Sequence, residues 1–181
     1  MESLAVTFEK GPSRRYRSLL RRDDGVEVAF DGGAYNRLGG GRELPHDLAH
    51  LIVERELGLA QGVWGVIASG GMFAHVTVVA GRQAPHAARR GRAVIDAAGD
   101  AIMQAEILTR VVCDTSAAGG RFDPARARRE IGERWWSAAL SRDAVDRCAE
   151  LLADGAHAWA ALAPGERLTE RWPAALVSRS R

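Results

Sequence analysis

Residues 4–30 read LAVTFEKGPSRRYRSLLRRDDGVEVAF, and this stretch contains three segments in which apolar and polar side chains alternate. Alternation of this kind is typical of strands that bury one face and leave the other in water. Asp24 and Gly25 stand between the second and third segments, and this pair favours a hairpin turn. We therefore predict an N-terminal antiparallel β-meander. Its buried side comprises Leu4, Val6, Phe8, Tyr16, Leu20, Val26, Val28 and Phe30.

Farther along the chain the apolar pattern changes from strand to helix. Residues 63–68 and 73–80 are apolar segments on either side of two glycines, which predicts a second β-hairpin. From about residue 92 the apolar residues recur every three to four positions, which predicts one long helix followed by further C-terminal helices. Strands precede helices instead of alternating with them, so the predicted class is α+β.

The length of 181 residues suits one domain. We expect an α+β domain over residues 1–120 that includes a central helix with two histidines. Residues 121–172 are expected to form a C-terminal helical part of the same domain, and residues 173–181 a frayed tail.

Composition limits the classes of partner. The net charge of +2 is small, so no affinity for nucleic acid is expected. The sequence has no apolar run long enough for a membrane span and no visible signal peptide, and its two cysteines stand alone, so we expect a cytoplasmic protein. Trp135 and Trp136 are neighbours that one apolar helix face cannot bury together. We expect Trp135 to lie in the core, and Trp136 to be partly exposed or to lie near an interface, such as one with a second copy of the chain.

The segment that indicates chemistry is PHDLAHLIVE, residues 45–54. His46 and His50 are four residues apart, so on a helix their rings share a face. Apolar residues occupy most of the other faces, which leaves His46, His50 and Glu54 in a polar notch. Burying such a notch costs free energy unless its groups are paired or bind a ligand. The spacing therefore predicts a site for zinc or another divalent metal.

A catalytic zinc site needs a third protein ligand, and the sequence offers two candidates. His75 is suitable by residue type and lies on the predicted second hairpin. Glu106 lies at the edge of the apolar stripe of a predicted helix, an unusual place for an unpaired carboxylate. Glu54 is two turns from His46, so we expect it to orient a histidine instead of binding the metal.

The segment His46 to His50, HDLAH, resembles the HExxH helix of zinc metallopeptidases over five residues. That resemblance implies that His46 and His50 bind zinc and that Asp47 activates a metal-bound water. Asp47 departs from the pattern because its side chain is one methylene shorter than glutamate. In such enzymes the third ligand on a later helix is often glutamate, which favours Glu106. The wider phrase, PHDLAH and VE followed by GVWG at residues 62–65, also resembles a family of uncharacterised actinobacterial proteins, which implies no activity.

Two functions follow from these patterns. The first is a metal-dependent, zincin-like hydrolase of unknown substrate with Asp47 as general base. The second is a non-enzymatic α+β protein that acts through helix-mediated association, in which the histidines pair with neighbouring acids. Metal content separates the two.

Overall fold

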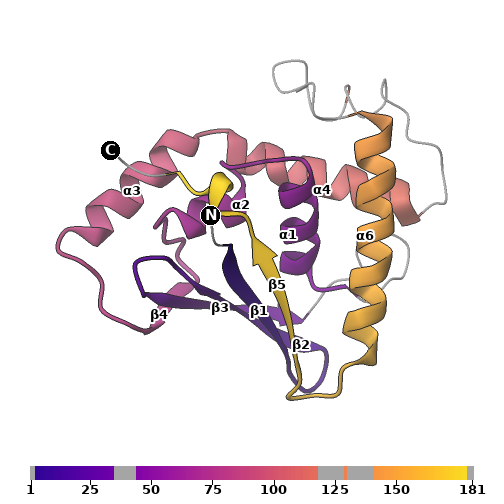
Figure 1. The fold of residues 1–181 in the computed structure, drawn as a ribbon, viewed down its shortest axis with the longest axis horizontal. Coiled ribbons are helices and arrows are strands. Elements are labelled where there is room, and N and C mark those ends of the chain that lie inside the picture. Colours follow the sequence, from indigo (N-terminus) through magenta and orange to yellow (C-terminus); the bar gives the residue numbers. More distant parts are fainter. Residues whose placement is uncertain (1–2, 35–43, 118–128, 130–140, 179–181) are drawn as a thin grey trace.

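The computed structural model describes residues 3–34, 44–117, 129 and 141–178. It confirms the α+β class, with a five-stranded antiparallel sheet and helices packed against it (Figure 1). Most of the first twenty residues of the expected C-terminal helical part, including Trp135 and Trp136, lie outside the described residues. No helix in the described part of the chain is long and apolar enough to cross a membrane.

The N-terminal meander is confirmed. Strands β1 (Leu4–Lys10), β2 (Arg15–Arg21) and β3 (Glu27–Ala34) pair antiparallel in chain order. Gly25 takes a positive φ of 79°, and the carboxylate of Asp24 accepts the N–H of Val26 at 2.9 Å. This pair therefore forms the turn between β2 and β3, because glycine adopts positive φ without steric cost.

The predicted second hairpin was wrong in its first half. Residues Val63–Ala68 form a short helix, α2, and only β4 (Val76–Ala80) is a strand, paired with β3. A short apolar run fits a buried helix as well as a buried strand. The helix forms here because the carboxylate of Glu54 accepts the N–H groups of Val63 and Trp64, which begin α2 and have no partner inside it.

The expected helical part ends earlier than residue 172. Residues Arg167–Trp172 form strand β5, which pairs with β1, so the strand order is β4-β3-β2-β1-β5. The following residues, expected to fray, include the short helix η2 (Ala174–Leu176). Ser178 donates its N–H to the hydroxyl of Ser69 at 2.8 Å. The chain therefore keeps tertiary contacts as far as residue 178.

The remaining helices cover one side of the sheet (Figure 1). The described helices besides α2 are α1 (His46–Glu56), α3 (Ala87–Ala98), α4 (Ala101–Ala117) and α6 (Arg142–Ala161). The apolar stripe that begins near residue 92 is divided between α3 and α4 at Gly99, where φ is +50°. Ser141 caps α6 through a hydrogen bond from the N–H of Ala144. Lys10, the single lysine of the chain, donates hydrogen bonds to the carbonyls of Trp159 and Leu162 at the C-terminal end of α6.

Helix α1 lies in the core between the sheet and helices α4 and α6. Its buried residues include Leu48, Leu51 and Ile52, and three tryptophans, Trp64, Trp159 and Trp172, are fully buried around it. Helix α6 comes close to α1 at Gly155, where an added Cβ would lie 2.9 Å from Cδ1 of Ile52. The histidine face of α1 therefore belongs to a helix whose position is fixed on several sides.

Candidate metal centre

Helix α1 presents His46 and His50 on the same face. Pro45 occupies the N-cap position, so both histidines fall within the regular helix. The two ring centroids are 4.5 Å apart. His50 is buried and His46 is part-exposed, with 2% and 39% of their side chains accessible. One ring therefore lies in the core and the other at the opening of the notch.

Helix α4 brings Glu106 to both rings. Its Oε2 lies 3.1 Å from Nε2 of His50 and 3.4 Å from Nε2 of His46. One ligand atom from each of these three residues lies within 4.8 Å of the others. Two imidazole nitrogens and a carboxylate oxygen form a ligand set that zinc uses in catalytic sites. The structure thus brings together the two helix histidines and the candidate third ligand from a later helix.

Glu54 is fixed behind His50. It is fully buried, and its Oε1 lies 2.9 Å from Nδ1 of His50. Its two oxygens also accept the N–H groups of Val63 and Trp64, each at 2.9 Å. Because Glu54 acts only as an acceptor in these contacts, the proton of the His50 contact belongs to Nδ1. That leaves Nε2 of His50 directed at Glu106, the arrangement in which outer carboxylates orient metal-binding histidines.

Asp47 is held in a similar position beside His46. Its Oδ1 lies 3.6 Å from Nδ1 of His46, and its Oδ2 accepts a hydrogen bond of 2.8 Å from the hydroxyl of Ser18. The indole of Trp64 donates to the backbone carbonyl of Asp47 at 2.8 Å. Each histidine therefore has a carboxylate at Nδ1 and shares Glu106 at Nε2.

These contacts shift the protonation of all three residues. Burial lowers the pKa of His50, but hydrogen bonds to Glu106 and Glu54 outweigh it and raise that pKa to about 9. The nearby carboxylates of Asp47 and then Glu106 raise the pKa of His46. The two histidines in turn hold the pKa of Glu106 well below its usual range. Without a metal, these contacts therefore favour the protonated form of the histidines and the ionised form of Glu106, and a divalent cation would compete with those protons.

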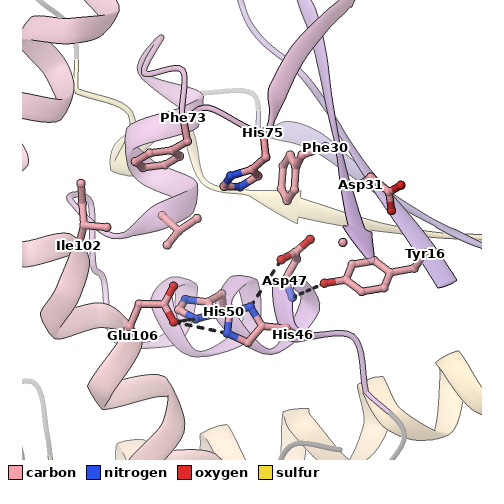
Figure 2. Close-up of a pocket in the computed structure, with 12 residues that line it drawn as sticks. Tyr16, Phe30, Asp31, His46, Asp47, His50, Phe73, His75, Ile102 and Glu106 are labelled. Carbon is pink, nitrogen blue, oxygen red and sulfur yellow. Dashed lines mark hydrogen bonds and ion pairs between the residues drawn. The ribbon is translucent and has the colours of Figure 1, made fainter. Parts of the chain in front are cut away.

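The cluster forms one wall of a cavity of about 490 Å³ (Figure 2). His46, His50, Glu106 and Asp47 lie on one side of it, and Phe73, His75 and Phe30 lie opposite (Figure 2). The cavity is lined by Tyr16, Phe30, Asp31, Gly32, His46, Asp47, His50, Val63, Phe73, His75, Ile102 and Glu106. The predicted site residues thus adjoin a space large enough for a small molecule.

His75, the other candidate third ligand, lies across the cavity from the two helix histidines (Figure 2). Its ring is parallel to that of Phe73, with centroids 6.1 Å apart, and meets Phe30 edge to face at 5.9 Å. It is not part of the ligand group formed by His46, His50 and Glu106. The structure therefore places His75 in the cavity wall instead of beside the ligands.

Several residues of the site were not identified from the sequence. Ser18 and Tyr16 come from β2, where alternation indicated only a buried side. Trp64 belongs to the phrase GVWG, whose role no pattern revealed. Gly62 precedes it, and a Cβ there would lie 2.5 Å from the Glu54 carboxylate. The repeated glycines around Trp64 were the one available signal of a close approach.

No family model matches the chain, and no curated protein or solved structure matches it either. The geometry of the cluster and its cavity is therefore the basis for assigning a function.

Proposed function

We propose that this protein is a divalent-metal-dependent hydrolase with the metal bound by His46, His50 and Glu106. The observation that carries the proposal is the direction of the ring nitrogens. Both Nε2 atoms face Glu106 and the cavity, while carboxylates lie beside both Nδ1 atoms. Such a set would supply three protein ligands beside the 490 Å³ cavity, and catalytic zinc keeps a further coordination position for water or substrate.

Zinc is the metal that this ligand set favours. Two imidazoles and one carboxylate suit zinc in a tetrahedral site, with manganese, iron and nickel as competitors for the same donors. A bound zinc ion supplies a water molecule of lowered pKa as the nucleophile. The buried hydrogen bonds of Glu54 support a metal at this site, because they fix the ring of His50, whose Nε2 is one of the proposed ligand atoms.

Asp47 is the proposed general base. It lines the cavity next to His46, and Ser18 holds one of its oxygens, so the carboxylate has a defined direction. The HExxH resemblance supports the same role. The carboxylate of Asp47 also lies close to Nδ1 of His46, so Asp47 has a second role, which is to orient that ring as Glu54 orients the ring of His50.

The non-enzymatic alternative rests on the same network. Each of the four ring nitrogens faces a carboxylate, so the polar notch is satisfied without a metal. In that case the cluster stabilises the contact between α1 and α4, and the protein acts by association. This alternative predicts a protein that binds no divalent metal at stoichiometric level.

Elemental analysis of protein purified without a His-tag tests the proposal. We expect close to one zinc per chain in the wild type, and loss of that zinc in His50→Ala because a ligand is removed. Asp47→Asn should keep the zinc and lose zinc-dependent hydrolysis of p-nitrophenyl acetate, a neutral activated ester. His157→Ala, an exposed histidine on α6, is the matched control and should change neither.

A wild-type protein that binds no zinc, manganese, iron or nickel removes the metal proposal and leaves the association alternative. Stoichiometric zinc together with full ester hydrolysis by Asp47→Asn would retain the metal site but remove Asp47 as base.

The cytoplasmic location remains part of the proposal. Cys113 and Cys148 are both buried and form no disulfide, and burial raises the pKa of Cys148 to about 12. A thiol of that kind has little thiolate character, so it is suited to packing instead of redox chemistry.

A further inference from the structure

We propose that the substrate of this site is an uncharged molecule with a flat apolar group attached to the bond that is cleaved, such as an aromatic amide or ester. This inference rests on the proposed metal site and concerns what occupies the cavity beside it. Two properties of the cavity carry it, the apolar wall opposite the ligands and the absence of lysine and arginine among the described lining residues.

The wall opposite the ligands is aromatic. Phe30, His75 and Phe73 succeed one another across the cavity from Asp47 (Figure 2). Their rings contact each other in pairs, with Phe73 parallel to His75 and Phe30 at a steep angle to it. Phe30 is buried and Phe73 is part-buried, so the wall has a fixed base and an accessible edge. A flat ligand group packs on such a wall by burying area and by ring-to-ring contact.

The aliphatic side chain of Ile102 extends the apolar wall toward the ligands. Ile102 and Glu106 lie one turn apart on α4, so one helix supplies both an apolar contact and a ligand atom. In Figure 2, Ile102 lies between Phe73 and Glu106 at one end of the cavity. The apolar group of a bound molecule would therefore lie close to its metal-binding end.

The charges of the cavity disfavour anionic substrates. Among the described lining residues there is no lysine or arginine. Three acidic side chains, Glu106, Asp47 and the buried Glu54, lie at or behind the wall that holds the two histidines. Asp31 adds a further carboxylate at the cavity, paired with Arg15 at 2.7 Å. Phosphoesters and carboxylate-rich substrates need basic partners, which this part of the site does not supply.

Hydroxamates test the inference, because they bind zinc while carrying different side groups. Isothermal titration of zinc-loaded protein would compare benzohydroxamate with acetohydroxamate, and both with the anionic phenylphosphonate. We expect benzohydroxamate to bind about tenfold more tightly than acetohydroxamate, and phenylphosphonate to bind most weakly.

Variants of the cavity wall separate its contribution to binding from the intrinsic affinity of each compound for zinc. Phe73→Ala and Ile102→Ala should weaken the binding of benzohydroxamate more than that of acetohydroxamate. The ratio of the two affinities should therefore fall toward one. Met103→Ala is the matched control, since Met103 follows Ile102 on α4 but is 65% exposed and outside the lining. Its ratio should equal that of the wild type.

The outcomes distinguish the two proposals. A protein that binds zinc stoichiometrically but shows equal hydroxamate affinities, or prefers phenylphosphonate, overturns the substrate class and leaves the metal site. A preference that survives in both Phe73→Ala and Ile102→Ala overturns the assigned wall. A protein that binds no zinc overturns the metal site and this inference with it.

Discussion

Glu54 is the residue on which the geometry of the candidate site most depends. It is fully buried and contacts His50 together with two backbone N–H groups of α2. In Glu54→Gln the side chain keeps its shape, but one oxygen is replaced by an amide NH2 group, which donates hydrogen bonds and cannot accept an N–H. We expect zinc affinity to fall about 10- to 100-fold, because the ring of His50 loses its charged partner. Competition with a fluorescent zinc chelator measures this change.

Glu56→Gln is the matched control for that experiment. Glu56 lies half a turn farther along α1 and pairs with Arg147 at 2.7 Å, away from the histidines. Its zinc affinity should equal that of the wild type. If the two variants lose equal affinity, Glu54 has no special role in orienting His50.

The protonation of His50 predicts how the stability of the metal-free protein depends on pH. The folded pKa of about 9 exceeds the ordinary value of 6.5, so the folded state binds the proton more tightly than the unfolded state. The resulting stabilisation is complete below pH 6.5 and is lost as pH rises toward 9. Urea unfolding of zinc-free protein should therefore show a lower free energy of unfolding at pH 9 than at pH 6.5.

Two comparisons test whether the lower free energy of unfolding at pH 9 arises from His50 and its carboxylate partners. His50→Gln should weaken the decrease, whereas His157→Gln, at an exposed position, should preserve it. Bound zinc should also remove it, because zinc-bound imidazoles are neutral in both pH ranges. A free energy of unfolding that rises between pH 6.5 and 9 contradicts the network described above.

At the scale of single residues, sequence reasoning identified the residues on α1 better than their partners. The spacing of His46 and His50 predicts a shared face, because helical geometry alone decides it. Glu106 could be singled out as an unusual carboxylate in an apolar stripe, but its contact with both rings depends on how α4 crosses α1. Ser18 gave no signal, since a serine on the inward side of a strand has no pattern of its own.

At the scale of elements, the connection between α1 and α2 links the core to the site. Gly62 lies against the Glu54 carboxylate, so Gly62→Ala places a methyl group where that carboxylate lies. Gly155→Ala is a matched variant, because its methyl group meets Ile52 on another face of α1. Overpacking of this kind typically costs about 1–3 kcal/mol, so both variants should be less stable by thermal unfolding.

Zinc affinity should separate these two glycine variants. We expect Gly62→Ala to bind zinc more weakly, since Glu54 must move, and Gly155→Ala to bind zinc as the wild type does. Equal affinities in the two variants would show that the position of Glu54 does not govern the site.

The elements that the sequence did not predict share one physical cause. Residues Val63–Ala68 and Arg167–Trp172 are short, and short segments take the structure that their distant partners favour. Helix α2 begins where Glu54 accepts its first N–H groups, and strand β5 forms by pairing with the edge of β1 that β2 does not occupy. The meander needed no distant partner, because its strands follow one another through local turns, and the sequence predicted it correctly.

At the scale of the whole molecule, strand β1 joins the two ends of the described chain. It pairs with β2 on one side and with β5 on the other, and its contacts with β5 include a pair of threonines 162 residues apart. Trp172 of β5 is fully buried. The sheet is therefore complete only when these two distant segments meet.

This pairing has a consequence for the order of synthesis. On the ribosome β1 is made early and β5 late. One edge of β1 therefore stays unpaired until β5 has been synthesised. A chain cut after residue 162 should lose cooperative unfolding by circular dichroism and aggregate, whereas a chain cut after residue 178 should behave as the full chain does. A synthetic peptide of residues 163–178, added during refolding, should restore the shorter chain by complementation. Cooperative unfolding of the shorter chain without peptide would show that β1 does not need this partner.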